Sequence, residues 1–140
     1  MSELDYDEQV EEIKKLNEPI LTDFQKSLEK AGLAKKTVKS HVDNIDFFAE
    51  YLVYYEPLQR LDEADEGDVS SFLLDWFPHK AMWASVSSTK SYLASFKKFF
   101  QWMGETKRIP SDVVDGVITM MKEERQGFLD AAAEEEDELW

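Results

Sequence analysis

Lysines stand beside hydroxyl side chains in two segments of this chain, a combination that suits binding of phosphate. Residues 24–41, the first basic segment, hold five lysines and one acid, and residues 79–108, the second basic segment, hold six basic residues and one acid. Ammonium groups neutralise phosphates, and hydroxyls donate hydrogen bonds to phosphate oxygens. The rest of the chain is strongly acidic, since the whole chain carries a formal net charge of -14.

Residue types that catalysis or metal binding needs are scarce. The chain has no cysteine, which excludes disulfides, thiolate catalysis and cysteine zinc sites. His41 falls on the apolar side of a predicted helix, and His79 falls in a predicted loop without a partner histidine. The sequence contains no H-E-x-x-H, G-x-x-x-x-G-K or G-x-S-x-G motif. We therefore predict no catalytic residues, no metal, no cofactor and no small-molecule substrate.

Acidic runs are the most frequent charged feature and need a separate interpretation. DEADEGD, residues 62–68, and EEEDE, residues 134–138, are typical of solvated surfaces. DEADEGD lacks the ligand spacing of an EF-hand loop. A chain with pI near 4.5 is not expected to bind nucleic acid or membranes broadly, which makes the two basic segments stand out.

The elements that must position these lysines are predicted to be helices. Apolar residues at steps of three and four predict one helix over 18–31, with Pro19 in its first turn and Gly32 as its C-terminal cap. A second helix is predicted from 34–36 to Tyr55, before Pro57. Residues 1–16 are predicted to form either a short helix or a partly disordered segment.

The second half of the chain shows the same periodicity. Asp65 is the predicted N-cap of a third helix that stops at Pro78. Residues 79–85 are predicted to be a loop. Ser85 or Ser87 then caps a fourth helix that reaches Met103, before Gly104. A fifth helix opens at Pro110 and Ser111, and residues 131–140 are a frayed end or an acidic tail. The predicted fold is all-α, a compact four- to five-helix bundle.

The order of these segments resembles the core-binding, SAM-like domain of phage-integrase-type tyrosine recombinases. The resemblance lies in FQKSLEKAGLAKKTVKSH, then LDEADEGDVSSFLLDWF, then SVSSTKSYLASFKKFFQWMGE, and it spans residues 18–104. Ala34 stands where that family usually has a serine, and His41 where an aromatic residue is common. The arginine, H-x-x-R pair and tyrosine of the catalytic domain are missing, so we expect no strand exchange by this chain alone. It is expected to be either part of a longer recombinase or a free-standing homologue.

In that family the domain clamps double-stranded DNA, mainly through its second and fourth helices. The resemblance therefore implies DNA contacts from residues of both basic segments: Lys35, Lys36, Thr37, Lys39, Ser40, Lys80, Ser87, Ser88, Thr89, Lys90, Lys97 and Lys98. Few arginines are present, so we expect weak readout of base sequence. The plainer alternative is that these lysines are solvated or paired with neighbouring acids.

Other interpretations concern partners and location. The apolar stripe of residues 111–129 could pack inside the protein or contact other recombinase protomers, which would make the chain a protein-interaction or assembly module that has lost strong DNA binding. A DNA-mimic role is a further alternative. No segment is long and apolar enough for a membrane span, so we expect a cytoplasmic protein. The predicted organisation is an acidic extension (1–17), a core-binding-like domain (18–108) and a C-terminal helix with an acidic tail (109–140).

Overall fold

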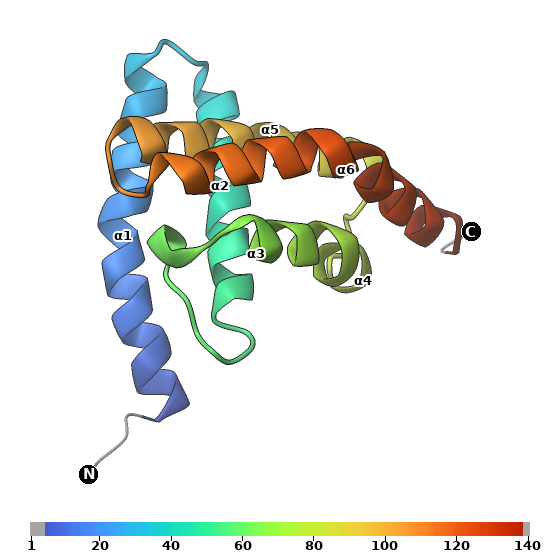
Figure 1. Ribbon diagram of the computed structural model, residues 1–140, viewed down its shortest axis with the longest axis horizontal. Helices are drawn as coiled ribbons and strands as arrows, with labels where there is room; N and C mark the ends of the chain where they lie inside the picture. Colours follow the sequence, from blue (N-terminus) through green and yellow to red (C-terminus); the bar gives the residue numbers. More distant parts are fainter. Residues whose placement is uncertain (1–4, 139–140) are drawn as a thin grey trace. The chain divides into compact units, whose positions relative to one another are not determined.

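The computed structural model describes residues 5–138, with side chains described to residue 134, and all its regular elements are helical (Figure 1). The predicted all-α fold is therefore confirmed. The chain divides into two compact units, unit 1 (residues 1–64) and unit 2 (residues 65–140). The three-part organisation predicted above follows charge and family pattern rather than contacts, and it stays a prediction.

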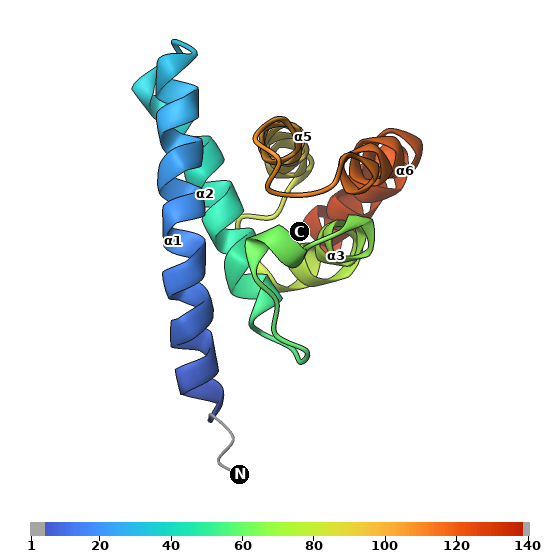
Figure 2. The same cartoon turned by 60° about the vertical axis from the view of Figure 1, so that its left-hand side comes forward.

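Unit 1 is a helical hairpin followed by an irregular connection. Helix α1 (Tyr6–Lys30) and helix α2 (Lys35–Leu52) lie side by side (Figure 2). Phe24 and Leu28 of α1 are buried, as are Ile45 and Phe48 of α2. The connection contains a single 3-10 turn, η1 (Leu61–Glu63). Its apolar residue Leu61 is fully buried, so the connection is held on the hairpin core.

Helix α1 begins about twelve residues earlier than the sequence predicted. Asp5 caps it, because its carboxylate accepts a hydrogen bond of 2.8 Å from the Glu8 N–H. Pro19 lies inside the helix, on its exposed side. The proline removes one backbone hydrogen bond, but the carbonyl it leaves open, four residues earlier, belongs to the exposed Lys15.

Two long-range hydrogen bonds explain why the first turns of α1 stay helical. The Tyr6 hydroxyl donates to the Val53 carbonyl, which ties the start of α1 to the residue after α2. The Asn17 side chain is buried, and its Oδ1 accepts from the Leu61 N–H at 2.9 Å. Both contacts join residues more than forty positions apart, so sequence periodicity could not reveal them.

The link between α1 and α2 matches its prediction at Gly32. This residue has φ +86°, and the N–H groups of Gly32 and Leu33 bond to the carbonyls of Glu29 and Leu28. That pattern is a Schellman cap, in which the left-handed position favours glycine.

Helix α2 ends at Leu52, three residues before the predicted end. The N–H groups of Val53 and Tyr54 instead form tighter turns with Glu50 and Tyr51, shortly before Pro57.

Unit 2 opens with a continuous helical segment in three parts. Helix α3 (Glu66–Ser71) passes into a π turn, η2 (Phe72–Trp76), and then into helix α4 (Phe77–Lys80). Asp65 caps α3 in a capping box with Asp68, as predicted.

The prediction that Pro78 stops this helix is wrong, and residues 79 and 80 are helical rather than loop. The π turn explains the difference, because the Phe77 N–H bonds five residues back to the Phe72 carbonyl. Pro78 therefore lies in the first turn of α4, where a missing N–H costs little.

Two long helices complete unit 2. Helix α5 (Val86–Glu105) starts at Ser85, whose hydroxyl accepts from the Ser88 N–H at 2.9 Å while the Ser88 hydroxyl accepts from the Ser85 N–H at 2.8 Å. Helix α6 (Ser111–Glu138) packs against α5 and includes most of the residues predicted to be a frayed end or a tail. Phe128 and Ala132 of α6 are fully buried, so its second half also contributes to the core.

Helix α5 continues through Gly104, which the sequence analysis placed after its end. A Cβ atom at Gly104 would lie 2.6 Å from Cγ2 of Val114 on α6, so glycine is needed for close approach of the two helices. The left-handed cap is Lys107 instead, with φ 59°. Its N–H bonds to the Gly104 carbonyl, and the Arg108 N–H bonds to the Met103 carbonyl, which repeats the Schellman pattern of Gly32.

The two Schellman caps predict opposite effects of substitution. Lys107→Gly should raise the free energy of unfolding by about 1 kcal/mol, because a left-handed conformation strains any residue with a Cβ atom. Gly32→Ala should lower it by a similar amount, since a Cβ there meets no atom within 4 Å and only backbone strain changes. Urea unfolding of both variants measures the difference. Equal effects of the same sign would contradict the assignment of the caps.

Candidate functional site

The first basic segment places its polar side chains on one exposed surface of α2. The predicted contact residues Lys35, Lys36, Thr37, Lys39 and Ser40 are all exposed, on the first two turns of the helix. Val38, which lies among them, and His41, which follows them, are buried, at 4% and 8% exposure. The helical repeat thus separates a core side from a polar side. The predicted apolar placement of His41 is confirmed.

The backbone at the start of α2 is also open to an anion. Ala34 is the N-cap and makes no side-chain capping bond, as its replacement of serine implied. No acidic residue lies in the first turn. The first N–H groups of a helix have no partner within the helix, and the helix dipole is positive there. Lysines at this position are unfavourable for the helix but favourable for a phosphate, which can bond to these N–H groups.

One lysine of this surface has an acidic neighbour. Lys39 Nζ lies 2.7 Å from Asp43 Oδ2, and both side chains are more than half exposed. Such an exposed i,i+4 pair contributes about 0.3–0.5 kcal/mol. Lys35 and Lys39 also line a groove together with Glu29 and Asp43, where the charges balance. A phosphate would therefore displace a weak ion pair rather than enter an already positive groove.

The second basic segment is more dispersed. Lys80 lies at the end of α4, and Ser87, Lys90, Lys97 and Lys98 lie on α5; all five side chains are exposed. Lys90 and Lys97 line the same groove, which confirms that seven residues place them on one side of the helix. Lys98 does not line that groove.

Two hydroxyls predicted to contact phosphate have other surroundings. Thr89 is fully buried, so its hydroxyl cannot reach a phosphate and this prediction is wrong. Ser88 is half-buried, and its hydroxyl takes part in the capping box with Ser85 and donates to the Trp83 carbonyl at 3.1 Å. Ser88 therefore stabilises the start of α5, and Ser87 is the exposed hydroxyl of this turn.

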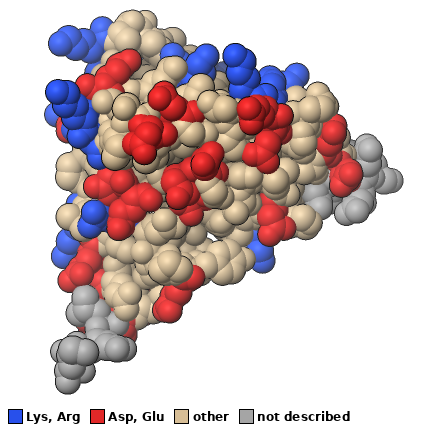
Figure 3. Space-filling model, in the orientation of Figure 1, with Lys and Arg blue, Asp and Glu red and all other residues tan. Residues whose placement is uncertain are grey.

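The groove between α5 and α6 contains two basic residues that the sequence analysis missed, Lys122 and Arg125. It has a volume of about 420 Å³ and combines four basic with four apolar side chains: Lys90, Leu93, Ala94, Lys97, Ile118, Met121, Lys122 and Arg125. On the face drawn in Figure 3, acidic side chains lie over α3 and α6, whereas basic ones gather along the upper margin of the view. Residues 109–140 carry a net charge of -8, because ten acids outnumber these two basic residues. The net charge of the segment therefore gives no sign of them.

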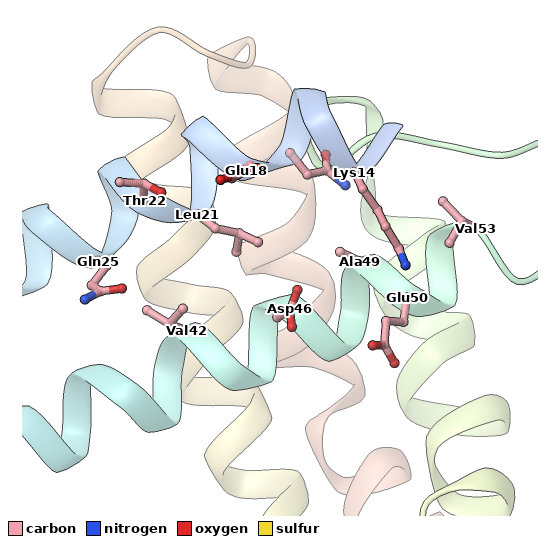
Figure 4. A pocket seen from close by; sticks show the side chains of 11 residues that line it. Lys14, Glu18, Leu21, Thr22, Gln25, Val42, Asp46, Ala49, Glu50 and Val53 are labelled. Atoms are coloured by element: carbon pink, nitrogen blue, oxygen red, sulfur yellow. The ribbon is translucent and has the colours of Figure 1, made fainter. Parts of the chain in front are cut away.

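A second groove, between α1 and α2 of unit 1, has the opposite charge. Its volume is about 360 Å³, and Figure 4 shows Lys14 and Glu18 of α1 across from Asp46 and Glu50 of α2. Three carboxylates and one ammonium group give this groove a net charge of -2. Within the described residues, no three histidine or acidic side chains gather in a way that could hold a metal ion. This groove therefore does not suit a phosphate.

Arg60, the single base of residues 42–78, is held by acids of its own connection. Its Nε donates to Asp62 at 2.9 Å and lies 3.8 Å from Glu63. The hydrogen bond to Asp62, and then the charges of Asp62 and Glu63, raise the pKa of the guanidinium. Arg60 is thus neutralised locally and does not extend the basic surface of α2.

The apolar stripe of α6 packs inside unit 2. Val117 and Phe128 are fully buried, and Met120 and Met121 are 6% and 7% exposed. Helix α6 contacts α3, η2, α4 and α5, so these side chains are covered by their own chain. Of the two fates predicted for this stripe, the intramolecular one is observed. Among the described residues no helix has the length and apolar character of a membrane span.

The chain matches a known protein-family model. The family model for the phage integrase N-terminal SAM-like domain matches residues 20–108, more than half of the chain. It covers the whole of both basic segments and ends before α6, and it does not include an integrase catalytic domain. The resemblance predicted for residues 18–104 is confirmed. No curated protein and no solved structure matched the chain.

Proposed function

The chain belongs to the family of phage integrase N-terminal SAM-like domains, and from this membership we propose that it is a DNA-binding module of a site-specific recombinase. In this proposal the start of α2 and the exposed side of α5 contact phosphates of duplex DNA. The module does not carry out strand exchange by itself, and the reacting groups belong to a separate catalytic domain. No cofactor or small-molecule substrate takes part.

The observation that carries the proposal is the exposed surface at the start of α2. It combines three lysines, two hydroxyls and an uncapped helix N-terminus within six residues. Each of these groups can bind phosphate oxygens. In a chain of net charge -14, this concentration favours a specific polyanionic partner over a general electrostatic surface.

The same residues predict weak sequence specificity. Arginine recognises guanine with a planar, bidentate fork, whereas lysine acts as a point charge, and recognition of adenine needs Asn or Gln at the surface that faces the groove of the DNA. The exposed positions of α2 and α5 named above hold lysines, serines and one threonine, without an arginine, asparagine or glutamine. We expect these lysines to position the duplex, and any strong sequence preference to come from elsewhere in the recombinase.

We expect measurable duplex binding that falls steeply with salt. If five of the exposed lysines contact phosphate, the slope of log K against log salt should be about -4 to -5. Fluorescence anisotropy of a generic labelled duplex, at several salt concentrations, measures this slope. Failure of micromolar protein to bind the duplex at about 50 mM salt would contradict the proposed function.

A further inference from the structure

The groove between α5 and α6 has a charge that sets it apart from the other grooves described. Its lining has four basic side chains and no carboxylate. The groove beside the start of α2 is balanced, with two lysines and two acids. The α1–α2 groove has a net charge of -2, and a groove lined by Glu12 and Glu56 also has two acids and no base. Positive charge at α5–α6 is thus a local feature of an acidic protein.

We propose that this groove binds one sugar–phosphate strand of duplex DNA, and that Lys122 and Arg125 of α6 contact it together with Lys90 and Lys97 of α5. The inference rests on the proposed DNA-binding function and extends it to a helix outside the family match. Lys122 and Arg125 stand three positions apart in sequence, so they project from the same side of α6. Both side chains are exposed and can reach a ligand.

The length of the basic strip agrees with a strand of phosphates. Lys90 and Lys97 are seven residues apart, which is about 10.5 Å along a helix. Successive phosphates of one DNA strand advance about 3.4 Å along the duplex axis. The lysines of α5 therefore span the axial rise of about three phosphates. Arg125 adds a planar guanidinium, which can donate two parallel hydrogen bonds to one phosphate.

The floor of the groove suits the sugars of such a strand. Leu93 and Met121 are nearly buried, Ile118 is half-buried and Ala94 is exposed. The carbon faces of deoxyribose can lie on these side chains, while the ammonium and guanidinium groups at the rim reach the phosphates. The aliphatic stems of lysine and arginine also cover apolar surface while their charged ends stay in water. The basic rim and the apolar floor of the groove thus both fit one ligand, a sugar–phosphate strand.

The test compares two double variants of the full chain that remove equal charge. Lys122→Gln with Arg125→Gln should make the salt slope of duplex binding less negative by about 1.8, because each lost phosphate contact removes about 0.9. Lys14→Gln with Lys15→Gln, on α1 and outside both basic segments, should change the slope by less than about 0.5. Both pairs are exposed, so the folds should be preserved, which far-ultraviolet circular dichroism checks.

Three results would overturn the inference. If the Lys122/Arg125 variant keeps the wild-type slope while substitutions at Lys35, Lys36 and Lys39 reduce it, the groove is not part of the interface, although the proposed function stands. If the wild-type protein does not bind duplex DNA, both fail together. If a labelled peptide with the sequence of residues 130–138 binds the wild-type protein but not the Lys122/Arg125 variant, and the DNA slope is unchanged, the groove binds an acidic peptide instead.

Discussion

Replacing Lys35, Lys36 and Lys39 by glutamine is expected to weaken duplex DNA binding by about 100-fold at 0.1 M salt and to reduce the salt slope by about 2.7. Each phosphate contact contributes about 0.9 to this slope through release of counterions. The three side chains are exposed on the first two turns of α2, so their loss should leave the hairpin of unit 1 intact. Anisotropy titrations across a range of salt concentrations measure both quantities.

Asp43 supplies a control of opposite sign. Asp43→Asn releases Lys39 from its 2.7 Å ion pair and removes a negative charge from the same surface, so DNA binding should become tighter. The Lys14 and Lys15 variant described above controls for loss of net charge alone. The proposed role of α2 would be refuted if the triple variant weakened binding no more per charge than that control, or if Asp43→Asn had no effect.

Phe72→Ala is expected to lower the stability of unit 2 by about 3–5 kcal/mol. Phe72 is fully buried and lies within 5.7 Å, between ring centroids, of Trp76, Phe77, Tyr92 and Phe96. It thus joins the π turn, α4 and α5 into one aromatic cluster. Truncation to alanine removes its ring contacts and leaves a cavity where the π turn, α4 and α5 meet.

Leu74, two residues away on the same turn, is the matched control for this substitution. It is 39% exposed, so Leu74→Ala should cost less than half as much as Phe72→Ala. The three tryptophans among the described residues, Trp76, Trp83 and Trp102, lie in unit 2, so tryptophan fluorescence during urea unfolding reports on this unit. Similar losses from the two substitutions would show that Phe72 does not organise the cluster.

Local signals were reliable where a few neighbouring residues decide the conformation. Asp65 caps α3, and Gly32 adopts the left-handed conformation after α1, as predicted from residue type and position. Of the two serines predicted as alternative caps of α5, Ser85 is the N-cap. Helical spacing likewise placed Lys90 and Lys97 on one side of α5. These features depend on side chains and backbone within about one or two helical turns, which sequence records directly.

Predictions failed where distant residues decide the conformation. Pro19 was predicted to lie in the first turn of a helix, yet α1 extends thirteen residues before it, because Tyr6 and Asn17 bond to residues 53 and 61. Gly104 was predicted to follow the end of a helix, yet it lies inside α5, where Val114 of α6 approaches too closely for a Cβ atom. The prediction that Pro78 stops a helix failed for a local reason, because a π turn places this residue at the start of α4.

In the candidate site, too, some features followed from the sequence and others only from the tertiary structure. The sequence by itself determined the all-α class, the family and the basic surface of α2, since these follow from composition, periodicity and the order of short segments. Only the tertiary structure decided that Thr89 is buried, and that Lys122 and Arg125 of an acidic helix join Lys90 and Lys97 in one groove. The physical reason is that helices α5 and α6 pack along their sides, which brings basic residues from distant parts of the sequence together. The net charge of each segment does not reveal which charges such packing brings together.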